Sequence, residues 1–358
     1  MGALLFIVSV ILSSVAVAVS SPNGGSEFLE NCSSNVDFAA ELLLFEKCTR
    51  STVTNPFKIG NGSLPFNKYA FLTTHNSYAI GSGPFLQGVR LTFINQEDSI
   101  TEQLTNGVRA LMLDTYDYKG EVWMCHSFKG ECHDYTAFKP AINYLNEVQA
   151  FLSSNPSEIV TLILEDYVKT PNGLTKLFND AGLMKYWFPV SRMPNNGGDW
   201  PLVNDMIAQN QRLVVFGSME EKEKSEGIAY QWNYMVENKY GNGGMVKGKC
   251  SQRKESSPLN DKTKSLVLVN HFKTIPLKAF TAKDNSEKLI DMLSTCYDAA
   301  GNRWANFVAV NFYKRCQGGG AFEATDKLNG RLMCGSDDLL ACAKKDQNAK
   351  NKKEALSI

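Results

Sequence analysis

The chain has 358 residues, of which 43% are hydrophobic and 11% aromatic, and its 37 basic residues balance its 37 acidic ones. Proteins that bind nucleic acid neutralise phosphates with clustered, excess Lys and Arg, so a formal charge of zero argues against nucleic acid as a partner. The apolar and aromatic content also excludes a disordered regulator, and is typical of a globular domain with a sizeable core.

The first predicted element, residues 1–20, is a secretory signal peptide. The run from Ala3 to Val19 is apolar apart from three serines, and small residues around Ala18 provide a cleavage pattern. No Lys or Arg precedes Lys47, so the positively charged region that normally opens such a peptide is missing. An uncleaved anchor helix is the alternative, but the run is short for a membrane span. We therefore expect a secreted protein whose mature chain has no transmembrane helix.

Nine cysteines fit this secretory route, because disulfides persist in oxidising compartments. Sequence proximity predicts bridges between Cys32 and Cys48 and between Cys125 and Cys132. The pairing of the others cannot be read from the sequence, and the odd count leaves at least one thiol unpaired within a monomer. Two Asn-x-Ser acceptors are also consistent with a secreted glycoprotein: Asn31 and Asn61.

Residues 21–343 are predicted to form one domain in which strands alternate with helices, followed by a polar, Lys-rich tail at 344–358. Seven apolar, β-rich runs predict strands at residues 69–74, 108–114, 121–125, 159–165, 213–217, 266–270 and 307–312. The amphipathic segment 136–153 predicts a helix that crosses from one strand to the next. This pattern favours an α/β fold of the TIM type, a (β/α)8 barrel that need not be regular, with residues 228–232 as the best candidate for an eighth strand. No GxGxxG opens a helix after the first strand, which argues against a nucleotide-binding open sheet.

Polar side chains follow four of these runs, at the point where each predicted strand ends. His75 follows the first run, Asp114 the second, His126 the third and Glu165 the fourth. In a β/α barrel the carboxyl ends of the strands form the active-site face, so we expect these side chains to converge on one pocket. Each also has a structural interpretation, as a histidine bonded within the fold or as a carboxylate that is solvated or caps a helix.

Four stretches of this region resemble a known family: FLTTHNSYA, NQEDSITEQLTNGVRALMLDTYDY, VWMCHSF and EIVTLILEDY. They are similar to the catalytic X domain of phosphatidylinositol-specific phospholipase C, and most of all to the plant secreted phospholipase-C-like phosphodiesterases. The resemblance is strongest over residues 71–168. It implies a hydrolase that cleaves a phosphodiester, such as a phosphoinositide or a related lipid, at a lipid surface.

The resemblance implies that His75 and His126 are the catalytic pair. Phosphodiester cleavage needs a base for the attacking hydroxyl and an acid for the leaving alkoxide, and imidazole suits both tasks near neutral pH. By family analogy His126 protonates the leaving group, and His75 acts as the base or as a donor to the phosphoryl oxygens.

The resemblance also implies a divalent cation, which is calcium in eukaryotic members, held by oxygen donors at Asn76, Asp114 and Glu165. Calcium-dependent relatives have a Glu where this chain has Met112, a thioether that binds calcium poorly, so a looser site is expected. Metal-free bacterial relatives place an arginine near the residue that matches Asp114. No arginine occurs between Arg109 and the end of VWMCHSF, so a cation remains the expected cofactor.

Two further residues are candidates for the same face. Asp117 is expected to be a metal ligand or a group that orients an imidazole. His271 follows the run 266–270 and is expected to bind a substrate phosphate or hydroxyl, or else to bond only to the backbone. Cys125 and Cys132, with two histidines nearby, also raise the question of a zinc site, but their spacing fits no zinc pattern that we can name.

Two other functions are alternatives to a phosphodiesterase. A non-catalytic secreted barrel would bind a phosphorylated headgroup or a protein partner, and Met112 at a ligand position favours it. A glycoside hydrolase would use Asp114 and Glu165 as its pair of carboxylates, but it gives the two histidines no role.

Overall fold

The computed structural model describes residues 48, 55–60, 62–81, 91–127 and 130–343, all of which belong to one unit, Glu46–Ile358. The predicted signal peptide at 1–20, the tail at 344–358, Cys32 and the two Asn-x-Ser acceptors lie outside the described residues. None of the helices in the described part combines the length and the hydrophobicity that a membrane span requires.

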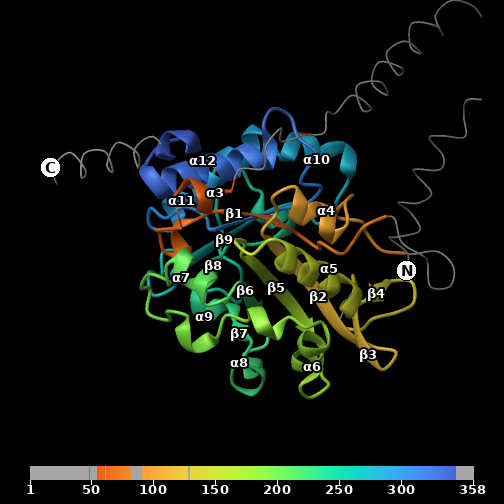
Figure 1. The fold of residues 1–358 in the computed structure, drawn as a ribbon. Helices are drawn as coiled ribbons and strands as arrows, with labels where there is room; N and C mark the ends of the chain where they lie inside the picture. Colours follow the sequence, from red (N-terminus) through yellow and green to blue (C-terminus); the bar gives the residue numbers. More distant parts are fainter. Residues whose placement is uncertain (1–47, 49–54, 61, 82–90, 128–129, 344–358) are drawn as a thin grey trace, which may run out of the picture. The chain divides into compact units, whose positions relative to one another are not determined.

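Eight parallel strands form the sheet, in the order β7-β6-β5-β2-β1-β10-β9-β8 (Figure 1). Their bounds are β1 (Phe71–Thr74), β2 (Ala110–Tyr118), β5 (Val160–Tyr167), β6 (Leu213–Gly217), β7 (Ala229–Tyr230), β8 (Met235–Glu237), β9 (Leu266–His271) and β10 (Phe307–Val310). The first strand pairs with the last, as in a β/α barrel. The strand order begins at β7 and ends at β8, and the short helix α9 (Gln231–Tyr234) connects these two strands. The predicted barrel of irregular form is confirmed.

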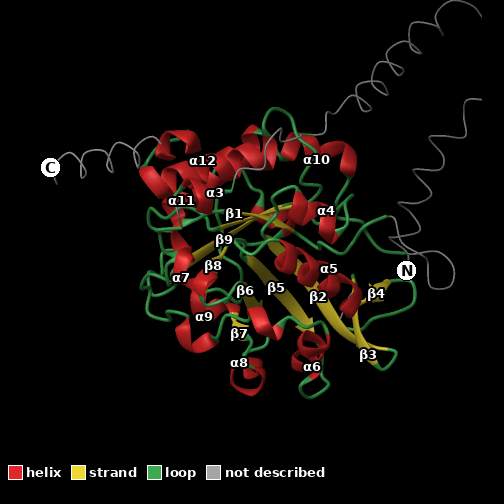
Figure 2. Cartoon of the chain, in the orientation of Figure 1, coloured by secondary structure: helices red, strands yellow, loops and turns green. Residues whose placement is uncertain are grey.

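Helices alternate with the strands along the chain and surround them (Figure 2). Besides α9 they are α3 (Pro56–Ile59), α4 (Ile100–Thr105), α5 (Ala141–Ser154), α6 (Gly173–Asp180), α7 (Val203–Ala208), α8 (Glu221–Glu226), α10 (Lys278–Asp284), α11 (Glu287–Ala299) and α12 (Gly320–Cys334). In α5 the buried side chains recur every three or four residues, which turns one apolar face toward the sheet. Helix α4 begins with a capping box between Ser99 and Glu102.

The predicted strand 121–125 is β3 (Glu121–Cys125), but it lies outside the barrel order. It runs antiparallel to β2 and to β4 (Ala137–Pro140), beside the parallel sheet. The reason is the connection: only Lys119 and Gly120, with φ of 51° and 81°, separate β2 from β3. Two residues with positive φ make a hairpin turn and are too few for a parallel crossover.

Two layers of core lie on opposite sides of the sheet, because side chains alternate along each strand. The inner layer includes Phe71 of β1 and Phe307 of β10, whose rings stack 5.5 Å apart. The outer layer, between strands and helices, includes Leu72 and Val308. Aromatic side chains therefore fill the barrel interior, and polar residues that continue the inward alternation come at its carboxyl end.

Candidate functional site

The inward alternation brings six polar residues to the carboxyl end of the barrel. Each lies two or four residues beyond an inward-facing apolar residue of its own strand: His75 after Phe71, Asp114 after Ala110, Glu165 after Ile163, Glu237 after Met235, Asn270 after Leu268 and Asn311 after Ala309. Asp114 and Glu165 are direct neighbours in the register of β2 and β5. The predicted convergence of His75, Asp114 and Glu165 is thus a consequence of strand parity.

His75 directly follows β1 and is held on two sides. Its ring stacks on that of Phe272, with 3.7 Å between centres and 6° between planes. Its Nδ1 lies 2.9 Å from Oδ1 of Asn311, which accepts, and 3.3 Å from Nδ2 of Asn95, which donates. The shorter contact favours the hydrogen on Nδ1, which leaves the Nε2 lone pair available. Burial, opposed by the bond to Asn311 and reinforced by the charges of His126 and Arg253, lowers the pKa of His75 to about 3.

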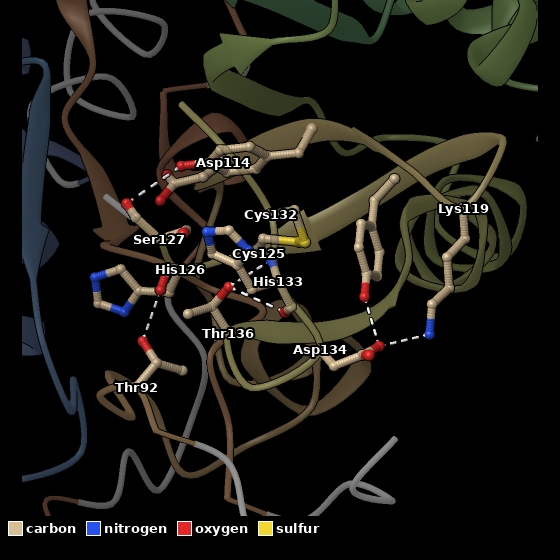
Figure 3. Close-up of a disulfide and its surroundings, with 12 residues drawn as sticks. Thr92, Asp114, Lys119, Cys125, His126, Ser127, Cys132, His133, Asp134 and Thr136 are labelled. Atoms are coloured by element: carbon tan, nitrogen blue, oxygen red, sulfur yellow. Dashed lines mark hydrogen bonds and ion pairs between the residues drawn. A yellow bond between two sulfur atoms is a disulfide. The ribbon is translucent and has the colours of Figure 1, made fainter. Parts of the chain in front are cut away.

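His126 directly follows β3 and is oriented in a similar way. Its backbone carbonyl oxygen accepts from Oγ1 of Thr92 at 2.7 Å (Figure 3). Its ring Nδ1 lies 3.3 Å from the carbonyl oxygen of Phe93, so Nδ1 donates. Burial lowers the pKa of His126, while the Phe93 carbonyl and Glu165 act in the opposite direction. A charge on His126 acts on His75 and contributes to the lowering of its pKa.

A disulfide between Cys125 and Cys132 holds the loop that follows His126 (Figure 3). This confirms the predicted bridge and removes the zinc alternative, because both thiols are consumed. The His126 ring is turned away from the two sulfur atoms. The prediction that Cys48 pairs with Cys32 is wrong: Cys48 pairs with Cys316, far along the chain. Two further bridges join Cys250 to Cys296 and Cys334 to Cys342.

The carboxylates beside the histidines form an oxygen-rich corner. Asp114 is buried, and the phenol oxygen of Tyr78 lies 2.9 Å from its Oδ2. Burial and the charge of Glu165 raise the pKa of Asp114, since two close carboxylates disfavour each other's ionisation. Asn76, two residues after the end of β1, is buried and has a left-handed backbone with φ of 45°.

These donors suit a hard cation in kind and in charge. Two carboxylates and an amide oxygen are ligands that calcium takes, and a cation would relieve the repulsion between Asp114 and Glu165. Met112, on the same face of β2, offers only a thioether. Within the described ranges, no group of three His, Cys, Asp or Glu side chains is arranged as a metal cluster.

A partly buried arginine, which sequence reasoning missed, lies beside the same corner. Arg253 reaches it from the loop after β8, and its charge acts on His75, Asp114 and Glu165. Its Nη1 lies 3.1 Å from Oε1 of Glu237. A positive charge beside Asp114 is therefore present, and it comes from a residue outside the stretch between Arg109 and VWMCHSF.

Glu237, the partner of Arg253, is fully buried and saturated with donors. Asn270 donates to its Oε1, and Gln231 and Trp232 donate to its Oε2 at 2.9 and 3.0 Å. The guanidinium of Arg253 also lies over the rings of Trp232 and Tyr240, at 5.2 and 4.8 Å from their centres. Glu237, Trp232 and Tyr240 therefore hold the arginine from three sides.

The structure does not bring Asp117 and His271 into the site, because both lie on the outward-facing parity of their strands. Asp117 is exposed and accepts from the backbone N–H groups of Lys169 and Thr170, at 2.7 and 2.8 Å. His271 is 2% exposed, and its Nε2 donates to the carbonyl oxygen of Asp284 at 2.9 Å. The backbone-bonded alternative for His271 is therefore the one observed.

Comparisons with known proteins identify the family and the fold. A family model described as PI-PLC X 1 matches residues 63–329. The chain is 52% identical over 342 residues to "PI-PLC X domain-containing protein At5g67130" of Arabidopsis thaliana, a match that covers 93% of this chain and 80% of that protein. It is 24% identical over 254 residues to "Uncharacterized secreted protein" of Arthroderma benhamiae, covering 66% of this chain and 56% of that protein.

Among solved structures, the phosphatidylinositol-specific phospholipase C from Listeria monocytogenes has the same fold. The two share a TM-score of 0.53 with 15% sequence identity, over 75% of this chain and 95% of that one. At this identity the likeness concerns the fold alone. The family model and the plant relative, however, span most of the chain. The chain belongs to the PI-PLC X domain family.

Proposed function

We propose that the protein is a phosphoric diester hydrolase with phospholipase-C-like chemistry. The observation that supports this most is the matched orientation of two imidazoles at one end of the barrel. Both His75 and His126 direct Nδ1–H to a fixed oxygen and leave Nε2 available. Two imidazoles that present the same nitrogen to one site are what a base and an acid on opposite sides of a phosphorus atom require.

In the proposed reaction, His75 and His126 move one proton each. A hydroxyl beside the phosphate, as inositol has, gives its proton to Nε2 of His75 while its oxygen attacks phosphorus. The bond from phosphorus to the leaving oxygen breaks, and Nε2–H of protonated His126 supplies the proton to that alkoxide. The negative phosphodiester raises the proton affinity of both rings when it binds, which offsets the effect of burial.

Positive charge beside the phosphoryl oxygens is proposed to come from two sources. A divalent cation, calcium in our proposal, would be held by Asn76, Asp114 and Glu165, and when bound it would act as a Lewis acid toward the phosphoryl oxygens. Arg253 supplies a fixed positive charge on the same side of the pocket. Because Met112 offers no oxygen, we expect the cation to bind more weakly than at a site with a third carboxylate.

A lipid surface is the proposed location of the substrate. Apolar side chains next to His126 are exposed, with Leu91 at 64%, Phe93 at 37% and Ile94 at 38%. Disulfides in the described part, together with the likeness to a protein named as secreted, support an extracellular location.

Turnover of phosphodiester lipids, measured with and without a chelator, tests the proposed function. We expect release of inositol phosphate from a phosphoinositide, a loss of about tenfold or more on chelation, and recovery on adding back calcium. Vesicles whose lipids have no hydroxyl next to the phosphodiester serve as the control. Binding of a phosphorylated headgroup without any turnover would instead support the non-catalytic alternative, which Met112 favours.

The disulfide beside His126 gives a prediction with a matched control. Replacing Cys125 and Cys132 by Ser is expected to lower the free energy of unfolding by about 2–3 kcal/mol and to lower turnover by about tenfold, because His126 loses its anchor. Cys334 and Cys342 close a loop of nearly equal length next to Gly330, at the other end of the barrel. Their double Ser variant should lose similar stability in urea unfolding and keep its turnover. Equal turnover of the two variants would contradict the coupling.

A further inference from the structure

A small cavity lies between the ends of β9 and β10 and helix α10. Its lining includes His271, Asn285 and Asn311, each no more than 2% exposed. Its volume is ≈ 10 Å³ for the centre of a water-sized sphere, which is about the space that one water molecule needs. Asn311 is also the residue whose Oδ1 faces Nδ1 of His75.

Each of these three residues has one polar side-chain atom without a hydrogen-bond partner among the described residues: Nδ1 of His271, Oδ1 of Asn285 and Nδ2 of Asn311. Their chemical roles follow from the bonds that the other atoms make. Nε2 of His271 faces a carbonyl oxygen and must have the hydrogen, so Nδ1 is an acceptor. Nδ2 of Asn285 faces the carbonyl oxygens of Asn311, Phe312 and Arg315, so Oδ1 is an acceptor as well.

We propose that one water molecule occupies this cavity, donating to His271 Nδ1 and Asn285 Oδ1 and accepting from Asn311 Nδ2. Two acceptors and one donor are the complement of a water with two hydrogens and a lone pair, and three bonds are usual for a buried water. The assignment leaves none of the three atoms unpaired, which a buried polar group requires.

The water decides which way the Asn311 amide points. Without it, Asn311 and Asn95 could turn over together, since Oδ1 of Asn95 also has no partner within the described part. Nδ2 of Asn311 would then donate to Nδ1 of His75, and His75 would have its hydrogen on Nε2. With the amide reversed, however, the water would face three acceptors and has only two hydrogens, so this arrangement is disfavoured.

His271 and Asn285 are therefore positioning residues for His75, acting through the water and Asn311. The consequence for catalysis rests on the proposed function: only the tautomer with Nδ1–H presents a basic Nε2 to the substrate. The charged side chains that face His271 are those of Asp284, Lys273 and Lys288, and of these residues Asp284 bonds to the ring through its backbone carbonyl oxygen.

Nitrogen NMR of the histidine rings in the protein without substrate tests the proposal. The chain has four histidines, so each ring signal can be assigned by single substitutions. In the native protein we expect His75 in the Nδ1–H form, with the other tautomer below about one tenth, because a buried unmet hydrogen bond opposes it. His271→Phe removes one acceptor, and the two tautomers should approach equal populations. His271→Gln keeps a donor for Asp284 and an acceptor for the water, and should restore the native ratio.

A crystal structure of the native protein provides the second measurement. An ordered water within about 3.2 Å of all three atoms supports the proposal, and density showing no water there overturns it, even if His271→Phe fails to fold. A mixture of His75 tautomers in the native protein would also overturn it. Because both measurements are made without substrate, they stand whether or not the protein cleaves phosphodiesters.

Discussion

Replacing His126 or His75 by Ala is expected to lower kcat/KM for a phosphodiester by about a hundredfold or more. General acid or base catalysis contributes at least this much, and each ring has its Nδ1 on a fixed oxygen, which leaves Nε2 for the proposed proton transfer. Steady-state rates on the substrate that the wild-type protein cleaves best would measure the loss. A loss below threefold for both variants would remove the two histidines from the mechanism.

His133 is the matched control for this prediction. It directly follows Cys132, the second cysteine of the bridge beside His126, and its ring stacks on Tyr135 at 5.1 Å between ring centres. His133→Ala should therefore keep turnover within about threefold of wild type, well short of what losing a catalytic acid costs. If His133→Ala loses as much as His126→Ala, the effect belongs to the loop as a whole and not to the His126 imidazole.

Replacing Arg253 by Met is expected to affect both stability and catalysis. Glu237 is fully buried, and without the Arg253 guanidinium the free energy of unfolding should fall by about 3 kcal/mol. This is the low end for a broken buried ion pair, because three neutral donors to Glu237 remain. Turnover should fall by about a hundredfold, because a preorganised positive charge next to the phosphoryl oxygens is lost. Urea unfolding and kcat/KM measure the two effects separately.

A second substitution separates the structural role of Arg253 from its electrostatic role. In the double variant Arg253→Met, Glu237→Gln, the buried charge is gone together with its partner, so stability should return to within about 1 kcal/mol of wild type. Turnover should stay low, since the positive charge is still missing. A double variant that regains most of its turnover would show that Arg253 acts only by compensating Glu237.

The site residues that the sequence predicts are those that directly follow long apolar runs. His75, Asp114 and Glu165 continue the inward face of β1, β2 and β5, and seven of the strands are visible as apolar segments. His271 and Asp117 lie on the outward face of their strands, because a shift of one residue along a strand reverses the direction of a side chain. The inward residue at the end of β9 is Asn270, one position before His271.

The missed residues give no local signal. Glu237 ends a strand of three residues, too short to show alternation, and Arg253 lies in an irregular loop whose direction depends on the whole fold. The bridge of Cys48 to Cys316 was missed for a related reason. It joins residues 268 positions apart, and only the pairing of the first strand with the last brings that part of the chain close.

A crystal structure of the protein with inorganic phosphate or vanadate bound tests the central proposal most directly. We expect the phosphorus or vanadium centre to lie between the two imidazoles, with one of its oxygens within about 3 Å of Nε2 of His75 and another within the same distance of Nε2 of His126. An anion that binds only elsewhere, or rings that turn Nε2 away from a shared pocket, would contradict the assignment of these two histidines as base and acid.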